Sequence, residues 1–290
     1  GGTYDSTNAC GVPDVTVIAK IGFDHMAILG DTLAKIAAEK AGIIKRGTAL
    51  VLESQEKEAM DVLNKAAERA DIKTTKVVNL DEIRILPQKD GKQCFSYAGY
   101  DAVTMKMLGV HQYENAVAAM LAAELFFEKY FAGKKSVPER KALQHAIREG
   151  IDRTQWMGRM ELVSNDPFFL MDGAHNSNGV EALKKSLETM YPDEKFHFIM
   201  GVMADKDYGE MIRELLPLAL DFKTVTVESE RALQGEALAD CIRAKGIPAE
   251  AYRNLEDVLP DFSKSSAEKT VAFGSLYFIG EIEAFLRGKQ

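Results

Sequence analysis

The sequence predicts an α/β protein in two parts. Short apolar, β-branched runs alternate with helical patterns over most of the 290 residues, which is typical of parallel sheets with helices between the strands. The apolar share is 46% and the charged share 28%, so collagen-like, disordered and coiled-coil classes are excluded. The pattern changes near Thr154, and we therefore expect domains over residues 1–153 and 154–290.

The first part begins with two strand–helix pairs. We expect strands over Asp14–Ile21 and Thr48–Leu52, and helices over Asp31–Ala41 and Gln55–Ala70. Asp31 is the predicted N-cap of the first helix, and Gly42 its stop. Thr75–Leu108 reads as short antiparallel hairpins appended to the main sheet, because turn residues interrupt it. Two helices follow, over about His111–Phe131 and Pro138–Gly150.

The second part has the pattern of a doubly wound sheet. Its predicted strands are Met160–Ser164, Phe168–Met171, Phe196–Met200, Thr224–Val227 and Thr270–Phe273. Helices are expected between them, for example over Val180–Met190 and Gly235–Lys245, and another closes the chain from Leu276.

Charge and cysteine content exclude several further classes. The formal charge is −8, whereas a general nucleic-acid binder needs a surplus of Lys and Arg. Three scattered cysteines give neither a disulfide framework nor a zinc site, which suggests a reducing compartment. The most apolar long stretch is too short to span a bilayer, and no signal peptide is present. We expect a cytoplasmic protein, free of membrane and nucleic acid.

Three segments have the form of a strand followed by small or polar residues and a helix. They are residues 21–25, 171–176 and 273–275, and ligands bind at such strand ends in open parallel sheets. His25, His111 and His175 fall in these loops or at a helix start. Singly, each is more often a structural histidine, but their joint placement favours a site.

Lys40 shares one helix face with Leu33, Ile36 and Ala37, so its side chain starts on the apolar side. One interpretation is snorkelling, in which the stem packs and the ammonium stays in water. The other is a desolvated amine of lowered pKa that reacts with carbon dioxide to give an anionic carbamate, whose oxygens could hold Mg²⁺. Periodicity alone favours snorkelling.

Other polar residues allow both a functional and a structural interpretation. Asp172 could accept hydrogen bonds from a ribose, or form an Asx-type turn before the helix from Val180. Arg159 could clamp a phosphate, or be a solvated arginine between domains. Lys206 could meet a carboxylate or phosphate, or be part of a solvated loop. Neither G-x-x-x-x-G-K-[ST] nor G-x-G-x-x-G occurs in the 290 residues.

Seven blocks of the sequence match, in the same order, the characteristic blocks of one known protein family. They are GGTYDSTN (1–8), IGFDHMAILGDTLAKIAAEKAGIIKRG (21–47), GVHQYENAVAA (109–119), WMGRMEL (156–162), DGAHNSNG (172–179), GVMADKD (201–207) and GSLYFIGE (274–281). Together they resemble folylpolyglutamate synthase, often combined with dihydrofolate synthase, within the Mur ligase superfamily. The resemblance implies the rest of a P-loop-type central ATPase domain, followed by a Rossmann-like Mur ligase C-terminal domain.

The resemblance also implies an activity, the ATP-dependent ligation of L-glutamate to folate or dihydropteroate through an acyl phosphate. The cofactors would be ATP and Mg²⁺, and the protein is expected to be a monomer. By position, the assigned residues are His25 and Lys40 (magnesium, the lysine carbamylated), Gln112 and Asn115 (adenine), Arg159 (phosphate), Asp172 (ribose or phosphate), His175 (nucleotide), and Lys206 and Ser275 (incoming amino acid). With this resemblance, carbamylation becomes the favoured interpretation of Lys40.

The resemblance has departures. Thr3 and Tyr4 stand where the family has Arg-Leu, Met157 where Pro is common, and Ser177 where Pro often follows His-Asn. The family's P-loop and a magnesium-binding glutamate lie upstream of its Gly-Gly, so we expect a truncated ligase that does not turn over ATP alone.

Three alternatives remain open. They are another amino-acid ligase of the superfamily, such as a peptidoglycan-precursor ligase, a non-catalytic nucleotide-binding fragment, and a metallohydrolase. The metallohydrolase would use His25 and a carbamylated Lys40, but the sequence offers no second histidine pair for a metal cage.

Overall fold

The computed structural model describes residues 2–23, 30–89 and 91–288, which form two compact units. Unit 1 comprises Gly1–Lys106 and His111–Thr154, and unit 2 comprises Met107–Val110 and Gln155–Gln290. The short segment of unit 2 differs from the expected division at residue 154. Leu108 lies in the unit 2 core, and the Val110 amide donates a hydrogen bond to Ser186 Oγ at 3.1 Å.

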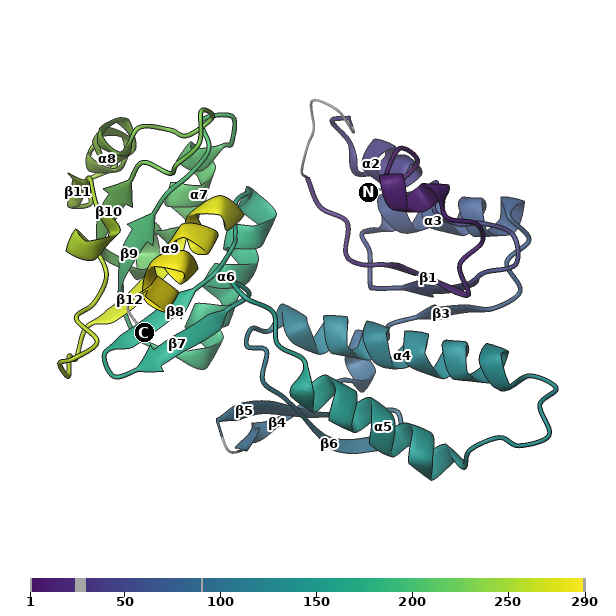
Figure 1. Cartoon of the computed structure of the whole chain (residues 1–290). Coiled ribbons are helices and arrows are strands. Elements are labelled where there is room, and N and C mark those ends of the chain that lie inside the picture. Colours follow the sequence, from purple (N-terminus) through teal and green to yellow (C-terminus); the bar gives the residue numbers. More distant parts are fainter. Residues whose placement is uncertain (1, 24–29, 90, 289–290) are drawn as a thin grey trace. The chain divides into compact units, whose positions relative to one another are not determined.

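Unit 1 contains a parallel sheet in the order β1-β2-β3, formed by Val15–Ile18, Ala49–Leu52 and Thr75–Val77. α2 (Leu33–Ala41) and α3 (Lys57–Arg69) lie on the same side of this sheet (Figure 1). They share with it an apolar core that includes Leu50 and Leu63. The predicted strands and helices are confirmed with shorter bounds. The predicted N-cap of α2 was wrong by one residue, because Thr32 accepts the Lys35 amide while Asp31 pairs with the Lys35 ammonium.

The remainder of unit 1 consists of α4 and α5 and a second sheet. α4 (His111–Phe131) contacts β1 and β2, and α5 (Arg140–Arg153) contacts both α4 and β6. β4 (Arg84–Lys89), β5 (Lys92–Tyr97) and β6 (Tyr100–Met105) form an antiparallel sheet of their own. The predicted antiparallel hairpins are confirmed, but they form a separate sheet and are not appended to the main one, which only β3 of this segment joins.

Unit 2 contains a six-stranded sheet in the order β11-β10-β9-β12-β8-β7, parallel except for β7. The strands are β7 (Glu161–Asn165), β8 (Phe168–Met171), β9 (Phe196–Met200), β10 (Ala219–Val225), β11 (Ala249–Tyr252) and β12 (Lys269–Phe273). The helices are α6 (Ser177–Met190), α7 (Tyr208–Leu215), α8 (Gly235–Arg243) and α9 (Leu276–Gly288). Short 3₁₀ turns span Ser6–Ala9, Leu80–Glu82, Leu216–Leu218 and Leu255–Asp257.

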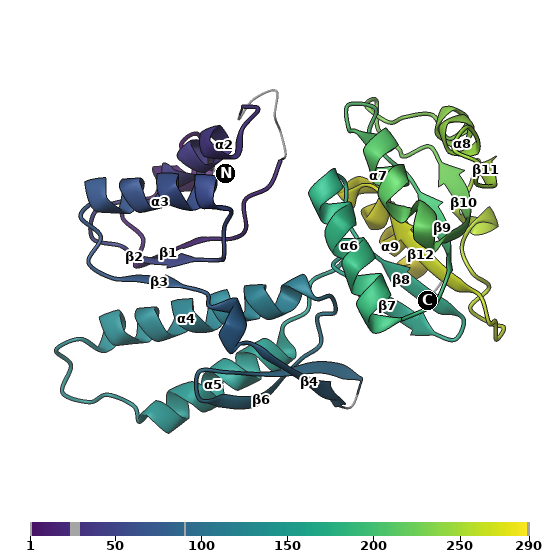
Figure 2. The ribbon, with the colours of Figure 1, turned by 180° about the vertical axis from the view of Figure 1, so that it is seen from behind.

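The helices of unit 2 cover both faces of its sheet. α6, α7 and α8 contribute to one apolar core and α9 to another, and Figures 1 and 2 show these two faces in turn. The unit has helices on both faces of a mostly parallel sheet, as the predicted doubly wound pattern requires, but β11 was missed and β10 begins and ends earlier than expected. Both strands have half-exposed positions, so their apolar signal is weak.

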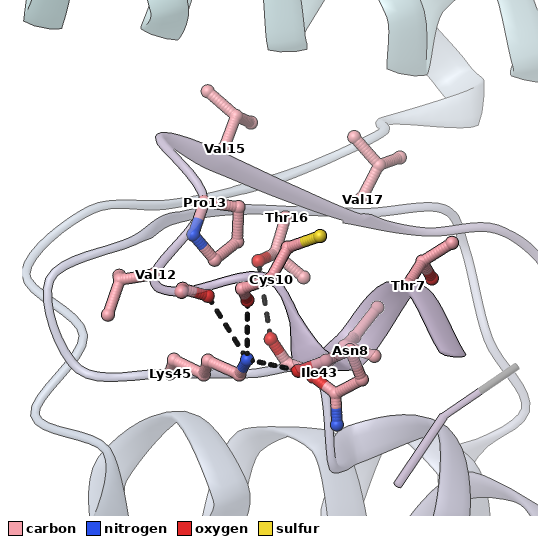
Figure 3. A pocket seen from close by; sticks show the side chains of 11 residues that line it. Thr7, Asn8, Cys10, Val12, Pro13, Val15, Thr16, Val17, Ile43 and Lys45 are labelled. Carbon is pink, nitrogen blue, oxygen red and sulfur yellow. Dashed lines mark hydrogen bonds between the residues drawn. The ribbon is translucent and has the colours of Figure 1, made fainter. Parts of the chain in front are cut away.

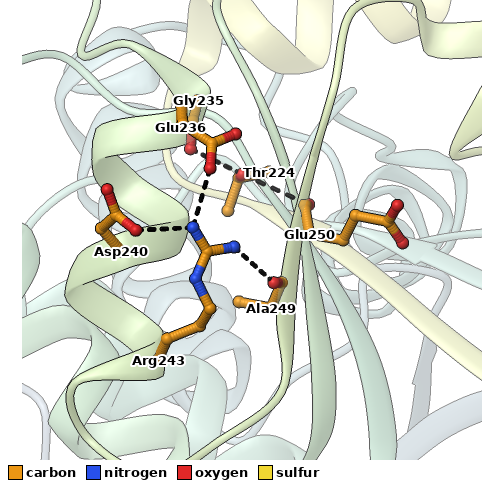
Figure 4. A network of polar contacts seen from close by, with 7 residues as sticks. All are labelled: Thr224, Gly235, Glu236, Asp240, Arg243, Ala249 and Glu250. Atoms are coloured by element: carbon orange, nitrogen blue, oxygen red, sulfur yellow. Dashed lines mark hydrogen bonds and ion pairs between the residues drawn. The ribbon is translucent and has the colours of Figure 1, made fainter.

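Side-chain contacts hold α8 beside β10 and β11 (Figure 4). The fully buried Thr224 hydroxyl donates to the Gly235 carbonyl at 2.8 Å, next to the first turn of α8. On the surface, Arg243 donates to Glu236, Asp240 and the Ala249 carbonyl. The Thr224 hydroxyl thus links α8 to β10, and the Arg243 bond to Ala249 links it to β11, whereas the ion pairs of Arg243 stay within α8.

Among the described residues, no helix is both long and apolar enough to cross a membrane. Cys10, Cys94 and Cys241 are free thiols.

Candidate functional site

Three loops of unit 2 meet at the carboxyl edge of its sheet. They follow β8, β12 and β9, which are neighbours in the sheet because β12 lies between the other two. Backbone hydrogen bonds join them: Asp172 N to Ala272 O (2.9 Å), Gly274 N to Ala174 O (2.9 Å) and Gly201 N to Phe273 O (3.3 Å). This edge is the place where open α/β sheets bind ligands.

Gly274 permits the close approach of the β12 and β9 loops. Its φ of +121° is a conformation that side chains disfavour, and an added Cβ would lie 2.5 Å from the Gly201 carbonyl oxygen. The two strand exits are therefore packed backbone to backbone.

Asp172 lies at the centre of this edge and is only 6% exposed. Its two carboxylate oxygens accept hydrogen bonds from the amides of Met160 and Ala174, each at 2.8 Å. Burial raises the pKa of Asp172 to about 6, against the lowering effect of these two amides and of the charges on Arg159 and His175. The bond to Ala174 is the Asx-type turn considered above, and the bond to Met160 links the loop to the start of β7.

Arg159 projects from a strained corner of the backbone. Gly158 has φ +64° and Met160 φ +46°, so both residues flanking Arg159 are left-handed. Gly173 N donates to Gly158 O at 2.7 Å, and Met160 is anchored to Asp172 as described. The backbone of Arg159 is therefore held beside the Asp172 loop from both sides.

His175 and Asn176 complete this loop. His175 is half-buried, and its Nδ1 donates to the Gly173 carbonyl at 2.8 Å. The N-cap of α6 is Asn176, whose Oδ1 accepts the Gly179 amide at 2.8 Å. The Asx-type turn of Asp172 therefore precedes α6 without capping it, because Asn176 is the N-cap.

Ser275 and Lys206 lie in the β12 and β9 loops. Ser275 is 3% exposed, and its hydroxyl accepts the Tyr277 amide at 3.1 Å, which places it at the start of α9. Lys206 is half-buried, and its neighbour Asp205 pairs with Arg231 at 2.7 Å. The Ser275 hydroxyl thus already has a structural task.

Gln112 and Asn115, the predicted adenine pair, are in direct contact in the first turn of α4 in unit 1. Asn115 Nδ2 donates to Gln112 Oε1 at 2.9 Å, and Gln112 Nε2 lies 3.1 Å from His111 Nε2. Gln112 is buried and Asn115 exposed, so the pair presents its Asn115 end to solvent.

Lys40 is half-buried in the last turn of α2, whose inner face is formed by Ile36 and Ala37. The amide of Thr3, in the block over residues 1–8, donates to the carbonyl of Glu39, the residue before Lys40, at 2.9 Å. The N-terminal segment therefore stabilises the end of the helix that carries Lys40.

A cavity of about 290 Å³ lies beside this N-terminal segment and β1 (Figure 3). In it, Lys45 Nζ donates to the carbonyls of Asn8 (2.7 Å), Cys10 (3.1 Å) and Gly11 (3.1 Å). The Lys45 ammonium group is therefore used to fix the loop, and this cavity offers a ligand no uncommitted positive charge from Lys45.

His25 falls within residues 24–29, outside the described part of the chain. Over the described ranges, no three His, Cys, Asp or Glu side chains are grouped so that they could hold a metal ion. The pairing of His25 with Lys40 stays a prediction.

The structure thus groups Arg159, Asp172 and His175 at one sheet edge of unit 2, and Gln112 with Asn115 in unit 1. Sequence reasoning missed the left-handed Met160 and the cap at Asn176. An asparagine just before the helical pattern was an available cap signal, whereas nothing in the sequence indicates a left-handed methionine.

Comparison with known proteins agrees with this architecture. Residues 3–123 match the Mur ligase middle domain, and residues 158–273 match the family described as Mur ligase, glutamate ligase domain. The fold and its loops are therefore those of a Mur ligase.

The relatives define the branch. The dihydrofolate synthase/folylpolyglutamate synthase of Bacillus subtilis is 33% identical over 99% of this chain and 66% of its own length. The folylpolyglutamate synthase of Lacticaseibacillus casei is 28% identical over 99% of this chain and 65% of its own. The chain belongs to the folylpolyglutamate synthase/dihydrofolate synthase family, and it spans about two thirds of the length of these relatives.

A solved structure has the same fold. Mycobacterium tuberculosis folylpolyglutamate synthase complexed with ADP and AMPPCP aligns with a TM-score of 0.81 and 28% identity, over 98% of this chain and 66% of that one.

Proposed function

We propose that this chain provides the nucleotide- and glutamate-handling domains of an ATP-dependent ligase that joins L-glutamate to folates, and to dihydropteroate as well. Membership of the family supports this proposal, as does the ADP and AMPPCP bound by the similar Mycobacterium tuberculosis enzyme. We further propose a cytoplasmic monomer.

The proposed reaction has two steps. A carboxylate of the folate attacks the γ-phosphorus of ATP, which gives an acyl phosphate and releases ADP. The amine of glutamate then attacks the acyl carbon, phosphate leaves, and an amide forms with loss of a proton. Neither step needs an oxidant or reductant, so catalysis consists of positioning and of stabilising charge.

In unit 2, Arg159 would contact the transferring phosphate, with Asp172 and His175 on the ribose or phosphate side. The support is geometric, because the bonds from the Met160 amide to Asp172 and from the Gly173 amide to the Gly158 carbonyl fix the backbone on both sides of Arg159. Lys206 and Ser275 would face the incoming glutamate.

In unit 1, Gln112 and Asn115 would contact adenine through their amide groups. Mg²⁺, held by His25 and by a carbamate on Lys40, would supply neutralisation of phosphate charge. The half-buried position of Lys40 is compatible with a carbamate, and intact mass before and after acid treatment would test for the added carbon dioxide.

The single observation that carries the proposal is the convergence of the Arg159 corner and the Asp172 loop at the carboxyl edge of the sheet. Calorimetry with Mg²⁺ and ADP tests it. Arg159→Met is expected to weaken binding, whereas Arg153→Met, which removes an exposed arginine of α5, is expected to leave it unchanged. Equal affinities of the two variants, or no binding by the wild type, would overturn the proposal.

The alternative of a non-catalytic nucleotide-binding fragment is favoured by one observation, the absence of G-x-x-x-x-G-K-[ST] from the 290 residues. We propose accordingly that the 290-residue chain alone binds nucleotide without turnover. Glutamate-dependent phosphate release in the presence of a folate measures this directly. Release by the purified chain would show that it needs no P-loop.

A further inference from the structure

In unit 1, the hydrogen bonds between β1 and β2 are followed by hydrogen bonds from the backbone after β1 to side chains after β2. The final paired residues are Ile18 and Leu52, followed by a bond from Glu53 N to Ile18 O at 3.0 Å. Beyond this point the Lys20 amide donates to Glu53 Oε2 at 2.7 Å. A side-chain carboxylate thus accepts the bond that a backbone carbonyl would accept in a longer strand.

Gln55 continues the same pattern. Its Oε1 accepts the Ile21 amide at 2.8 Å, and its Nε2 donates to the Ala19 carbonyl at 3.1 Å. A primary amide has the donor and acceptor of a peptide group, so Gln55 replaces one residue of a neighbouring strand. Residues 19–21, which follow β1, are thus hydrogen-bonded to side chains although β2 has already ended.

The first turn of α4 is attached to the same place. Glu114 Oε1 accepts the amide of Ser54, between Glu53 and Gln55, at 2.7 Å. Hydrogen bonds to an ionised acceptor are short and strong, and this one fixes a helix against a strand exit. Glu114 is the residue immediately before Asn115, and two residues after Gln112.

We propose that Glu114 is a positioning residue for the Gln112–Asn115 pair through its bond to the Ser54 amide, and that the side chains of Glu53 and Gln55, on either side of Ser54, hold this segment against the exit of β1. We call these three side chains the exit ladder. The inference rests on the proposed adenine role of the pair. It adds residues that touch no nucleotide but set the place and orientation of those that do.

The same hydrogen bonds could serve only to stabilise the fold. The test must therefore distinguish stabilisation of the segment around Ser54 from orientation of the Gln112–Asn115 pair. Glu114→Gln keeps an oxygen for the Ser54 amide, whereas Glu114→Leu removes it. Gln55→Leu removes the support from the strand side, away from α4. Glu128→Leu, at the exposed far end of the same helix, is the matched control.

Two measurements are made on the full 290-residue chain: amide hydrogen exchange at Ser54 and Ile21, and the dissociation constant for ADP with Mg²⁺. We expect Glu114→Leu and Gln55→Leu to speed exchange and weaken ADP binding about 10-fold, since each removes strong hydrogen bonds. Glu114→Gln and Glu128→Leu are expected to keep wild-type affinity.

The remaining outcomes overturn the inference in distinguishable ways. Faster amide exchange with unchanged ADP affinity would mean that the exit ladder stabilises the fold only. That result would overturn the positioning role of Glu114 and leave the proposed function standing. Equal weakening by Glu114→Gln and Glu114→Leu would indicate that the charge itself acts on the nucleotide. No ADP binding by the wild type would overturn the proposed function and the inference with it.

Discussion

Replacing Glu53 by glutamine should make unit 1 more stable at alkaline pH. Glu53 is 3% exposed, and burial raises its pKa to about 7, with a further contribution from the neighbouring charge of Glu114. The Lys20 amide and the Lys20 charge oppose this rise. Glutamine has nearly the same shape and keeps an oxygen for the amide, but it cannot ionise in the buried site.

The magnitude follows from proton linkage. Between pH 4.5, the ordinary pKa, and about 7, the folded state binds more protons at Glu53 than the unfolded state does. The free energy of unfolding therefore falls as pH rises through this window and is level above it. Since a tenfold change in proton affinity corresponds to about 1.4 kcal/mol, the ionised carboxylate costs unit 1 about 3 kcal/mol at pH 8.

Native-state hydrogen exchange can measure this for each unit separately. Amides of β2 report the opening of unit 1, and amides of β9 in unit 2 serve as the internal reference. Asp172, whose pKa is also raised, gives unit 2 a slope of the same sign in both proteins. We expect Glu53→Gln to remove the slope of unit 1 alone, and the exposed Glu56→Gln to change nothing. Parallel pH profiles for Glu53→Gln and wild type would refute the reasoning.

Three further substitutions test unit 2 by urea and thermal denaturation. Gly274→Ala should lower its free energy of unfolding by roughly 2–4 kcal/mol, because the new Cβ meets the Gly201 carbonyl at a disfavoured φ; no loss would refute the close approach. Thr224→Val should cost about 1–2 kcal/mol, since the Gly235 carbonyl loses its buried donor. Arg243→Ala should leave the melting temperature almost unchanged, because its ion pairs are exposed; a large drop would contradict this.

Elements with strong local signals were predictable. The helix over His111–Phe131 has its predicted bounds, and so do the strands Phe168–Met171 and Phe196–Met200, which are almost entirely buried. β11 was missed because an edge strand with half-exposed positions has little apolar periodicity. The strand predicted to reach Ile21 ends at Ile18, and the amides of Lys20 and Ile21 beyond it bind the side chains of Glu53 and Gln55 instead of a neighbouring strand.

The positions of the candidate site residues were predictable only where the local sequence pattern determines them. Asp172 falls at a strand end, and Gln112 and Asn115 share a helix turn, so both placements follow from periodicity. The contact between Glu114 and Ser54 joins residues 60 positions apart, and no local pattern encodes it. The one sequence signal for Glu53 was a carboxylate placed directly after the apolar run of β2.

Unit 2 includes Met107–Val110, a segment that lies between the two parts of unit 1 in the sequence. This matters for any attempt to produce unit 2 alone. An expressed piece beginning at Gln155 would lack Leu108 from its interior, and the Ser186 hydroxyl would lose the amide it accepts. Such a piece should be prone to aggregate, and adding a synthetic peptide containing residues 107–110 should restore its solubility.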